Sequence, residues 1–272
     1  MRTFTFALCA SALATAAAAQ NECAAGKTLD EGTLTIATGN PAYYPWVLDD
    51  APESGQGFEA AVAYALAEAM GFTADQVTWV RTSFDEAIQP GVKDFDLNMQ
   101  QYSITPERDQ MVDFSEPYYY SAMAALTTES IIEATGAEPT LDSLKGLKWG
   151  AVATTTALPV LTDLIAPDSD PLLYGDNADV TAAMQAGQID AALFDLPTAL
   201  YLSAVVLDGG TILGQFPADG GNSPDTFGML MEDGNPLKEC VDAAIAEMTE
   251  NGKLAEIETT WLQDATGVPV IE

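Results

Sequence analysis

Hydrophobic and polar positions along the chain repeat with two periods, one typical of strands and one of helices. Short apolar, β-branched runs predict three strands in the first part of the chain, at residues 34–38, 77–80 and 95–99. Between the first two runs, residues 58–72 carry apolar side chains at helical spacing, and Gly71 supplies a stop. Ser83 and Glu86 form the capping pattern of a further helix. This alternation predicts a parallel sheet covered by helices.

A second α/β unit follows the turn-rich segment 131–146. Its predicted elements are a strand at 147–152, a helix through 161–164, a helix at 177–188 with Asn177 as cap and Gly187 as stop, a strand at 189–195 and a helix with Pro197 in its first turn. Two amphipathic helices, broken at Asn251-Gly252, follow near the C-terminus. Two α/β units favour a cleft between them, where small ligands usually bind.

The first nineteen residues have the pattern of a cleaved secretory signal. A positive charge at Arg2 precedes a short apolar run that ends in small residues, which predicts a signal peptide at 1–19. The run is shorter than the roughly 20 residues that a membrane span needs, so we expect an exported protein. Cys9 leaves with the signal, and the remaining Cys23 and Cys240 predict one disulfide. Two unrelated buried thiols are the alternative.

The charge balance excludes several classes of function. The chain has 41 acidic and 9 basic residues, so it has no basic surface that would bind nucleic acid, and anionic membranes are disfavoured. The acids are scattered along the chain, which is typical of a solvated surface; calcium sites are the alternative, but no Asp-x-Asp-x-Asn-Gly loop occurs. Histidine is absent, which excludes Ser-His-Asp and Cys-His catalysis and the usual zinc sites. We expect no metal and no cofactor.

One arginine, Arg108, lies in a position typical of ligand contacts. Thr105 and Pro106 predict a helix start, so the residues before them form a loop at the carboxyl end of the strand at 95–99. A guanidinium there suits a carboxylate or phosphate, and the Ser103 hydroxyl adds a donor. A surface arginine paired with one of the many acids is the alternative.

Several motifs resemble those of the extracytoplasmic solute-binding proteins of family 3, which bind polar amino acids for ABC importers. The resembling strings are SITPER (103–108), VDFSEPYYY (112–120), GTLTIATGNPAYYPW (32–46), GFEAAVAYALAEAMGF (57–72), LKGLKWGAVATTT (144–156), AGQIDAALFD (186–195) and NGKLAEIETTWL (251–262). The resemblance covers most of residues 30–265 in order. It implies the α/β, two-lobe periplasmic-binding-protein fold of type II, with the ligand cleft between the lobes. Lobe 1 would be 27–124 plus 225–272, and lobe 2 would be 125–224.

The resemblance also implies a role for individual residues. Arg108, with Ser103 beside it, would hold the ligand α-carboxylate, and Asp195 would receive the α-ammonium. Hydroxyl and backbone N–H groups at Thr155 and Thr156 would also face the carboxylate. Two rings, Tyr43 and Phe84, would pack on the ligand side chain. From the residues alone, the two rings would more often belong to the core or the rim, and Asp195 could be a helix cap.

Three positions depart from the commoner family pattern and bear on the ligand side chain. Gln101 stands where many relatives have a small residue, and Thr154 stands where they have glycine. Asn40 stands where relatives for basic amino acids have aspartate, which disfavours a cationic ligand. A fourth residue, Glu59, either contacts a polar ligand or complements the helix dipole.

The residues and the resemblance together predict a periplasmic receptor of an ABC importer, a monomer that binds a small amino acid or related zwitterion by lobe closure and performs no chemistry. Its partner would be the permease in the inner membrane. One alternative is an enzyme similar to cyclohexadienyl dehydratases, with Glu59 or Asp195 as general acid. Another is a ligand sensor for a membrane receptor.

Overall fold

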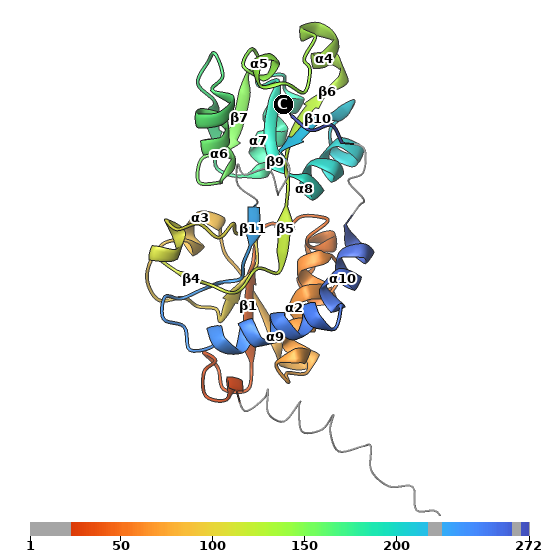
Figure 1. Ribbon diagram of the computed structural model, residues 1–272. Helices are drawn as coiled ribbons and strands as arrows, with labels where there is room; N and C mark the ends of the chain where they lie inside the picture. Colours follow the sequence, from red (N-terminus) through yellow and green to blue (C-terminus); the bar gives the residue numbers. More distant parts are fainter. Residues whose placement is uncertain (1–22, 217–224, 263–267, 272) are drawn as a thin grey trace, which may run out of the picture. The chain divides into compact units, whose positions relative to one another are not determined.

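The computed structural model describes residues 23–216, 225–262 and 268–271, and the predicted signal peptide lies outside them (Figure 1). The chain divides into two compact units. Unit 1 comprises Met1–Gln100, Thr105–Glu116 and Gly228–Thr260, and unit 2 comprises Gln101–Ile104, Pro117–Phe227 and Trp261–Glu272. Compared with the predicted lobes, the structure groups residues 101–104, 117–124, 225–227 and 261–272 with unit 2. Strand pairing within unit 2 accounts for 117–124 and 225–227, and bridges of Ser103 to Phe227 and of Gln215 to Val270 account for the other two segments.

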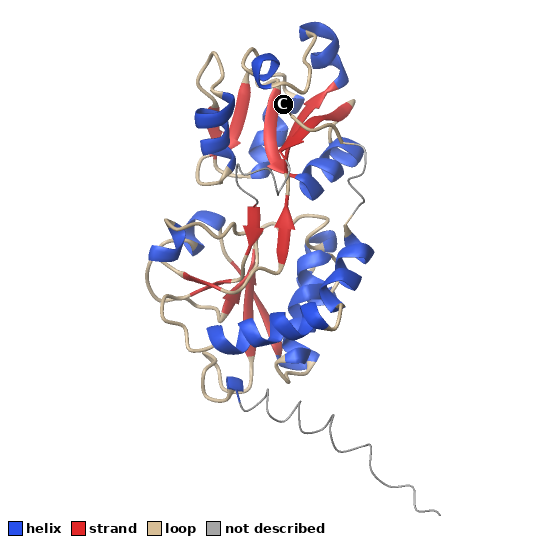
Figure 2. Ribbon diagram, in the orientation of Figure 1, coloured by secondary structure: helices blue, strands red, loops and turns tan. Residues whose placement is uncertain are grey.

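Unit 1 has a five-stranded sheet in the order β2-β1-β3-β12-β4, with helices around it (Figure 2). The strands are β1 (Leu34–Thr38), β2 (Val77–Arg81), β3 (Leu97–Asn98), β4 (Asp113–Phe114) and β12 (Leu230–Met231). Its helices are α2 (Phe58–Ala69), α3 (Phe84–Ala87), α9 (Lys238–Glu250) and α10 (Lys253–Trp261), with 3-10 turns η1 (Leu48–Asp50), η2 (Pro52–Ser54), η3 (Ala74–Gln76) and η4 (Arg108–Gln110). β1 pairs in parallel with both β2 and β3, and β12 runs antiparallel. α2 packs against α9 beside the sheet (Figure 1).

Unit 2 has a five-stranded sheet in the order β10-β6-β9-β7-β8 and a two-stranded ladder of β5 and β11. The strands are β5 (Tyr119–Ser121), β6 (Met123–Thr128), β7 (Trp149–Val152), β8 (Leu172–Tyr174), β9 (Ala191–Asp195), β10 (Gly210–Phe216) and β11 (Asp225–Phe227). The helices are α4 (Glu129–Thr135), α5 (Leu141–Leu144), α6 (Ala157–Pro159), α7 (Asn177–Gln185) and α8 (Leu196–Tyr201), with π-helical turns η5 (Val160–Ile165) and η6 (Leu202–Val206). β7 is parallel to β8 and β9, whereas β6 is antiparallel to β9 and β10.

Strand β9 shows why the apolar runs predict buried strands. Ala191 and Leu193 face one core cluster of unit 2, while Ala192 and Phe194 face the other. A strand whose successive side chains point to opposite faces needs a continuous apolar run when both faces are buried. The run at 189–195 therefore predicts the strand correctly, and its polar end, Asp195, marks where the strand leaves the core.

The predicted elements are found, with corrections at their ends. The helix predicted to be capped by Asn177 has Asp176 as its cap instead, because the Asp176 carboxylate accepts the Asp179 backbone N–H at 2.8 Å. The helix predicted through 161–164 is π-helical. Ser83 caps α3 as predicted, accepting the Glu86 N–H at 3.3 Å, although α3 is only four residues long. The stretches of the chain that the structure describes contain no helix that is both long and apolar enough to cross a membrane.

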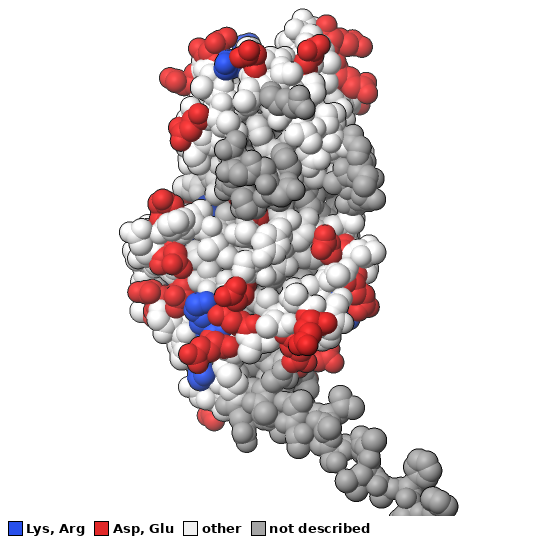
Figure 3. Space-filling view, in the orientation of Figure 1, with Lys and Arg blue, Asp and Glu red and all other residues white. Residues whose placement is uncertain are grey.

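Acidic side chains are spread over the face shown in Figure 3 rather than gathered in one patch. Such an arrangement fits the solvated acidic surface that the sequence predicts. Basic side chains on described residues form ion pairs that are mostly local. Lys145 pairs with Asp142 three residues away, and Lys253 pairs with Glu256 in the same way. Exposed pairs of this kind contribute little to stability.

The predicted disulfide is confirmed. Cys23 is bonded to Cys240 on α9, with a Cα–Cα distance of 5.9 Å and a sequence separation of 217 residues. Both cysteines belong to unit 1, so the bond fixes the start of the described chain to the helix layer of that unit.

We expect the double variant Cys23→Ser, Cys240→Ser to lose about 2–4 kcal/mol of unfolding free energy, because the bond restricts the unfolded chain over a long loop. Urea denaturation of the mature protein measures this loss. Reductant should lower the stability of the parent protein to that of the variant and leave the variant unchanged. Equal stability of parent and variant without reductant would show that the bond contributes nothing.

Candidate functional site

The predicted site residues of unit 1 follow the carboxyl ends of its parallel strands. Asn40 and Tyr43 come after β1, Phe84 comes after β2, and the segment leading to Arg108 comes after β3. Since β2 and β3 both pair in parallel with β1, these three loops begin at the same edge of the sheet. In open α/β sheets this edge is where ligands bind.

Arg108 is buried, with 6% of its surface exposed. Its backbone N–H donates to the Thr105 hydroxyl at 3.2 Å, so Thr105 caps the turn that leads into η4; the predicted helix itself is only this three-residue 3-10 turn, which begins after Glu107. The guanidinium carbon lies 5.3 Å from the centroid of the Phe84 ring. A planar cation over a ring face is held by cation–π attraction, which fixes the plane of the fork. The burial of Arg108 argues against a position on the exposed surface.

The loop after β1, residues 39–50, is named here the aromatic loop, and it docks on the start of α2. The carbonyl of Trp46 accepts the backbone N–H groups of Glu59 and Ala60 at 3.0 and 3.3 Å. The Trp46 indole is 1% exposed and meets the Phe58 ring edge-on, with centroids 5.7 Å apart. Gly57 permits this approach, because its φ is +101° and a Cβ there would lie 2.5 Å from the Trp46 carbonyl oxygen.

Glu59, predicted either to contact a ligand or to complement a helix dipole, is the second residue of α2. Its side chain belongs to the buried part of unit 1, with 1% of the residue exposed. Tyr43 is half-buried and Asn40 is exposed, both within the aromatic loop. A carboxylate in the first turn of a helix is favoured by the helix dipole, which supports the second of the two predicted roles for Glu59.

In unit 2, the predicted site residues again follow parallel strands. Thr155 and Thr156 come after β7, and Asp195 ends β9, which is parallel to β7. The segment 101–104 joins this unit by a bridge between Ser103 and Phe227 of β11. The structure thus places Ser103, Thr156 and Asp195 in one unit and Arg108 in the other.

Two hydroxyls and a carboxylate form a chain in unit 2. The Thr156 hydroxyl donates to Asp225 Oδ1 at 2.9 Å, and the Ser103 hydroxyl lies 3.3 Å from that of Thr156. Thr156 has one hydroxyl proton and gives it to Asp225, so Ser103 is the donor to Thr156. In this arrangement both hydroxyl protons point toward Asp225.

Thr155 has a supporting position instead. Its hydroxyl donates to the Val152 carbonyl at 3.0 Å, and its backbone N–H donates to the same oxygen at 3.3 Å. Both donors that were predicted to face a ligand carboxylate are thus directed to the end of β7. Thr155 stabilises the turn that presents Thr156.

Asp195 is the N-cap of α8, the alternative that the sequence left open. Its Oδ1 accepts the Thr198 backbone N–H at 2.8 Å. Burial raises the pKa of the Asp195 carboxyl from 3.8 to about 6; hydrogen bonds from Thr198 oppose this shift, and the nearby Asp225 adds to it. A buried carboxylate of this kind favours a cation that compensates its charge.

Two features of the site were missed by the sequence prediction: the buried Asp225 and the backbone conformation of Gln101. Asp225, which is 5% exposed, was not predicted, and no local pattern of the sequence points to it. Gln101 has a φ of +53°, an uncommon conformation for a residue with a side chain. Backbone strain of this kind clusters at ligand sites, so Gln101 keeps its interest as a determinant of specificity.

Comparison with known proteins gives this chain a family. A sequence model of the bacterial extracellular solute-binding proteins, family 3, matches residues 34–264. The L-cystine-binding protein TcyJ of Escherichia coli strain K12 is 29% identical over 246 residues, which cover 86% of this chain and 84% of TcyJ.

Two solved structures show the same fold. An ancestral arginine-binding protein bound to glutamine superposes with a TM-score of 0.69 and 26% identity, covering 85% of this chain and 98% of that one. The ancestral amino acid-binding protein AncCDT-1, described as a precursor of cyclohexadienyl dehydratase, has a TM-score of 0.68 and 24% identity, covering 85% and 96% of the two chains. The predicted type II periplasmic-binding-protein fold is confirmed.

We expect Asp195→Asn to stabilise the ligand-free protein at neutral pH. The amide oxygen can still cap α8, and the buried negative charge is removed. Because the folded-state pKa is raised, the carboxyl destabilises the fold progressively as pH rises from about 4 to about 6, and by a constant amount above that. Unfolding free energies measured from pH 4 to pH 8 should show a gain of roughly 1–3 kcal/mol above pH 6 that vanishes near pH 4. Asp208→Asn, an exposed acid of the same unit, is the control, and an equal gain there would refute the assignment.

Proposed function

Because the chain belongs to the bacterial extracellular solute-binding proteins, family 3, we propose that it binds a small amino acid for an ABC importer. The observation that carries the proposal is the buried Arg108, whose guanidinium is oriented by the Phe84 ring at the ligand edge of a parallel sheet. A planar fork held in this way matches the two oxygens of an α-carboxylate. Charge-assisted hydrogen bonds of this type contribute about 1.5–3 kcal/mol each.

Unit 2 supplies the complementary chemistry for an α-ammonium group. Asp195 carries a carboxylate whose pKa is raised chiefly by burial, and an ammonium partner would favour its charged form. The hydroxyl chain from Ser103 through Thr156 ends on the Asp225 carboxylate, so both hydroxyl protons are directed toward that acid rather than toward a ligand carboxylate. We therefore assign Ser103 and Thr156 to the ammonium end of the ligand, whereas the sequence alone favoured the carboxylate end.

The ligand side chain is proposed to be neutral. Asn40 replaces the acid that the resemblance associates with basic ligands, and the rings of Tyr43 and Phe84 suit an uncharged group. The relatives support a zwitterionic ligand of moderate size, since one is named for cystine and another is an ancestral arginine-binding protein that holds glutamine. Gln101, at its strained position, is the proposed polar contact for such a side chain.

The proposed partner is the permease of an ABC transporter, which takes up the ligand unchanged, and the proposed location is the periplasm. Family membership supports both statements, because the family model describes extracellular solute-binding proteins. We propose a monomer without catalytic activity.

An enzyme similar to cyclohexadienyl dehydratases is the second candidate, and one observation favours it. A carboxyl with a pKa of about 6, as at Asp195, is partly protonated near neutral pH and suits a general acid. Incubating the protein with prephenate or arogenate and following product by NMR separates the two functions. Sustained turnover that is lost in Asp195→Asn would establish the enzyme, and absence of product would leave the binding protein.

A thermal-shift screen of the purified protein against amino acids should identify the ligand class. A ligand at 100 times its dissociation constant stabilises the folded state by about 2.7 kcal/mol. We expect neutral amino acids to raise the melting temperature and arginine and lysine to raise it less. A larger shift with the basic amino acids would refute the proposed role of Asn40.

We expect Arg108→Ala to lower the affinity for the amino acid found in this screen by at least about 100-fold, because a carboxylate would lose its paired cation. Calorimetric titration measures the loss. Arg108→Lys retains the charge without the fork and should bind with intermediate affinity. Unchanged affinity in Arg108→Ala, in protein that still unfolds cooperatively, would refute the carboxylate site.

A further inference from the structure

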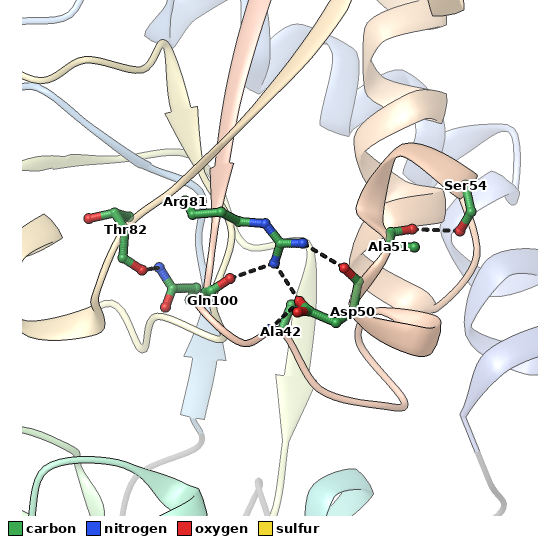
Figure 4. A network of polar contacts seen from close by, with 8 residues as sticks. Ala42, Asp50, Ala51, Ser54, Arg81, Thr82 and Gln100 are labelled. Carbon is green, nitrogen blue, oxygen red and sulfur yellow. Dashed lines mark hydrogen bonds and ion pairs between the residues drawn. The ribbon is translucent and has the colours of Figure 1, made fainter.

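The aromatic loop is anchored on one side by α2, and a single side chain, Arg81, holds it on the other. Arg81 ends β2 and reaches both ends of the loop (Figure 4). We infer that Arg81 is a positioning residue, which sets the conformation of the aromatic loop and thereby the affinity for the ligand. The inference rests on the proposed function.

Three hydrogen bonds carry this inference. Arg81 Nη1 donates to the Gly39 carbonyl at 2.7 Å and to Asp50 Oδ1 at 2.6 Å, and Nη2 donates to the Asp50 carbonyl at 2.6 Å (Figure 4). Gly39 is the first residue of the loop and Asp50 is the last. One guanidinium therefore joins the two ends of the loop to the end of the neighbouring strand.

Asp50 extends the clamp into the loop. The oxygen that accepts from Arg81, Oδ1, also accepts the Ala42 backbone N–H at 2.9 Å. Asp49 and Asp50 both have left-handed backbones, with φ of +52° and +54°, and each such residue costs about 1 kcal/mol outside glycine. The contacts of Asp50 offset this cost, so losing Arg81 removes the support of an otherwise unfavourable turn.

The clamp encloses the loop residues that are proposed to meet the ligand. Asn40 follows Gly39 directly, and Tyr43 follows Ala42 directly. Gly39 also lies against the Gln100 side chain, because a Cβ added to Gly39 would be 3.1 Å from Gln100 Oε1. Gln100 donates in turn to Asn98 Oδ1 at 3.1 Å, at the end of β3. The loop is thus set against the ends of three strands, β1, β2 and β3.

The clamp acts on conformation more than on global stability. The side chains of Arg81 and Asp50 are 30% and 46% exposed, and an ion pair with this exposure contributes little to unfolding free energy. The α2 anchor remains when Arg81 is lost, because the carbonyls of Pro45 and Trp46 still accept N–H groups of that helix. Lysine cannot reproduce the clamp, since its single ammonium lacks the second nitrogen, Nη2, that donates to the Asp50 carbonyl while Nη1 contacts Gly39 and Asp50 Oδ1.

The test compares Arg81→Ala, Asp50→Ala, the double variant and the control Lys253→Ala. The control removes the same charge and an ion pair, with Glu256, that lies outside the loop. Affinity for the amino acid selected by the thermal-shift screen is measured by calorimetry. Hydrogen exchange followed by mass spectrometry reports on residues 39–50 in the ligand-free protein.

We expect Arg81→Ala and Asp50→Ala each to weaken affinity by roughly 10- to 100-fold, although they change the net charge in opposite directions. The double variant should be no weaker than either single variant, because both remove one clamp. Exchange should increase at 39–50 in all three, with the melting temperature close to that of Lys253→Ala.

Several results would overturn the inference. Unchanged affinity in Arg81→Ala overturns it while leaving the proposed function intact, since the parent protein still binds. Opposite effects of Arg81→Ala and Asp50→Ala would show an influence of charge rather than of loop conformation. Weaker binding with unchanged exchange at 39–50 also contradicts it. A parent protein that binds none of the amino acids overturns the proposed function, and this inference with it.

Discussion

Parallel pairing of strands is the constraint on which the chemistry of this protein depends. A parallel ladder brings the carboxyl ends of neighbouring strands to one edge, so residues far apart in sequence meet there. In unit 1 this edge gathers the loops after β1, β2 and β3, and in unit 2 it gathers the turns after β7 and β9. In each unit the predicted polar site residues thus lie at one edge of a sheet whose strands are apolar along most of their length. The buried strands tolerate no charge along their length, so the charged groups stand where the strands end.

Sequence patterns predict the parts of this fold that depend on near neighbours. Apolar runs give the strands, helical spacing gives α2 and α9, and the Thr105-Pro106 pair gives the turn that carries Arg108. The sequence predicts the wrong cap for α7, Asn177 instead of Asp176. Both side chains can cap a helix, and only the backbone conformation, which is extended at Asp176, decides between them. The carboxylate of Asp225 could not be predicted, since its partner Thr156 is 69 residues away and no local period records such a contact.

The few basic residues of this acidic chain make two different kinds of contact. Lysines such as Lys145 and Lys253 pair within one turn of their own helix or its end. The two arginines of the described residues instead act across sequence: Arg81 joins a strand to a loop 31 to 42 residues earlier, and Arg108 lies over the ring of Phe84. The planar, multivalent guanidinium suits such tasks better than an ammonium group does. Removing either arginine is therefore a local change in geometry as much as a change in charge.

The bond between Cys23 and Cys240 has a consequence for the covalent connectivity of the molecule. Its 217-residue span encloses residues 117–227, the longest segment of unit 2. That segment is therefore part of a closed covalent ring whose ends are joined in unit 1. A protease that cuts any single peptide bond between the two cysteines leaves one molecule until a reductant opens the ring. In a member of an extracellular protein family, the chain can thus be nicked between these two cysteines without shedding a fragment.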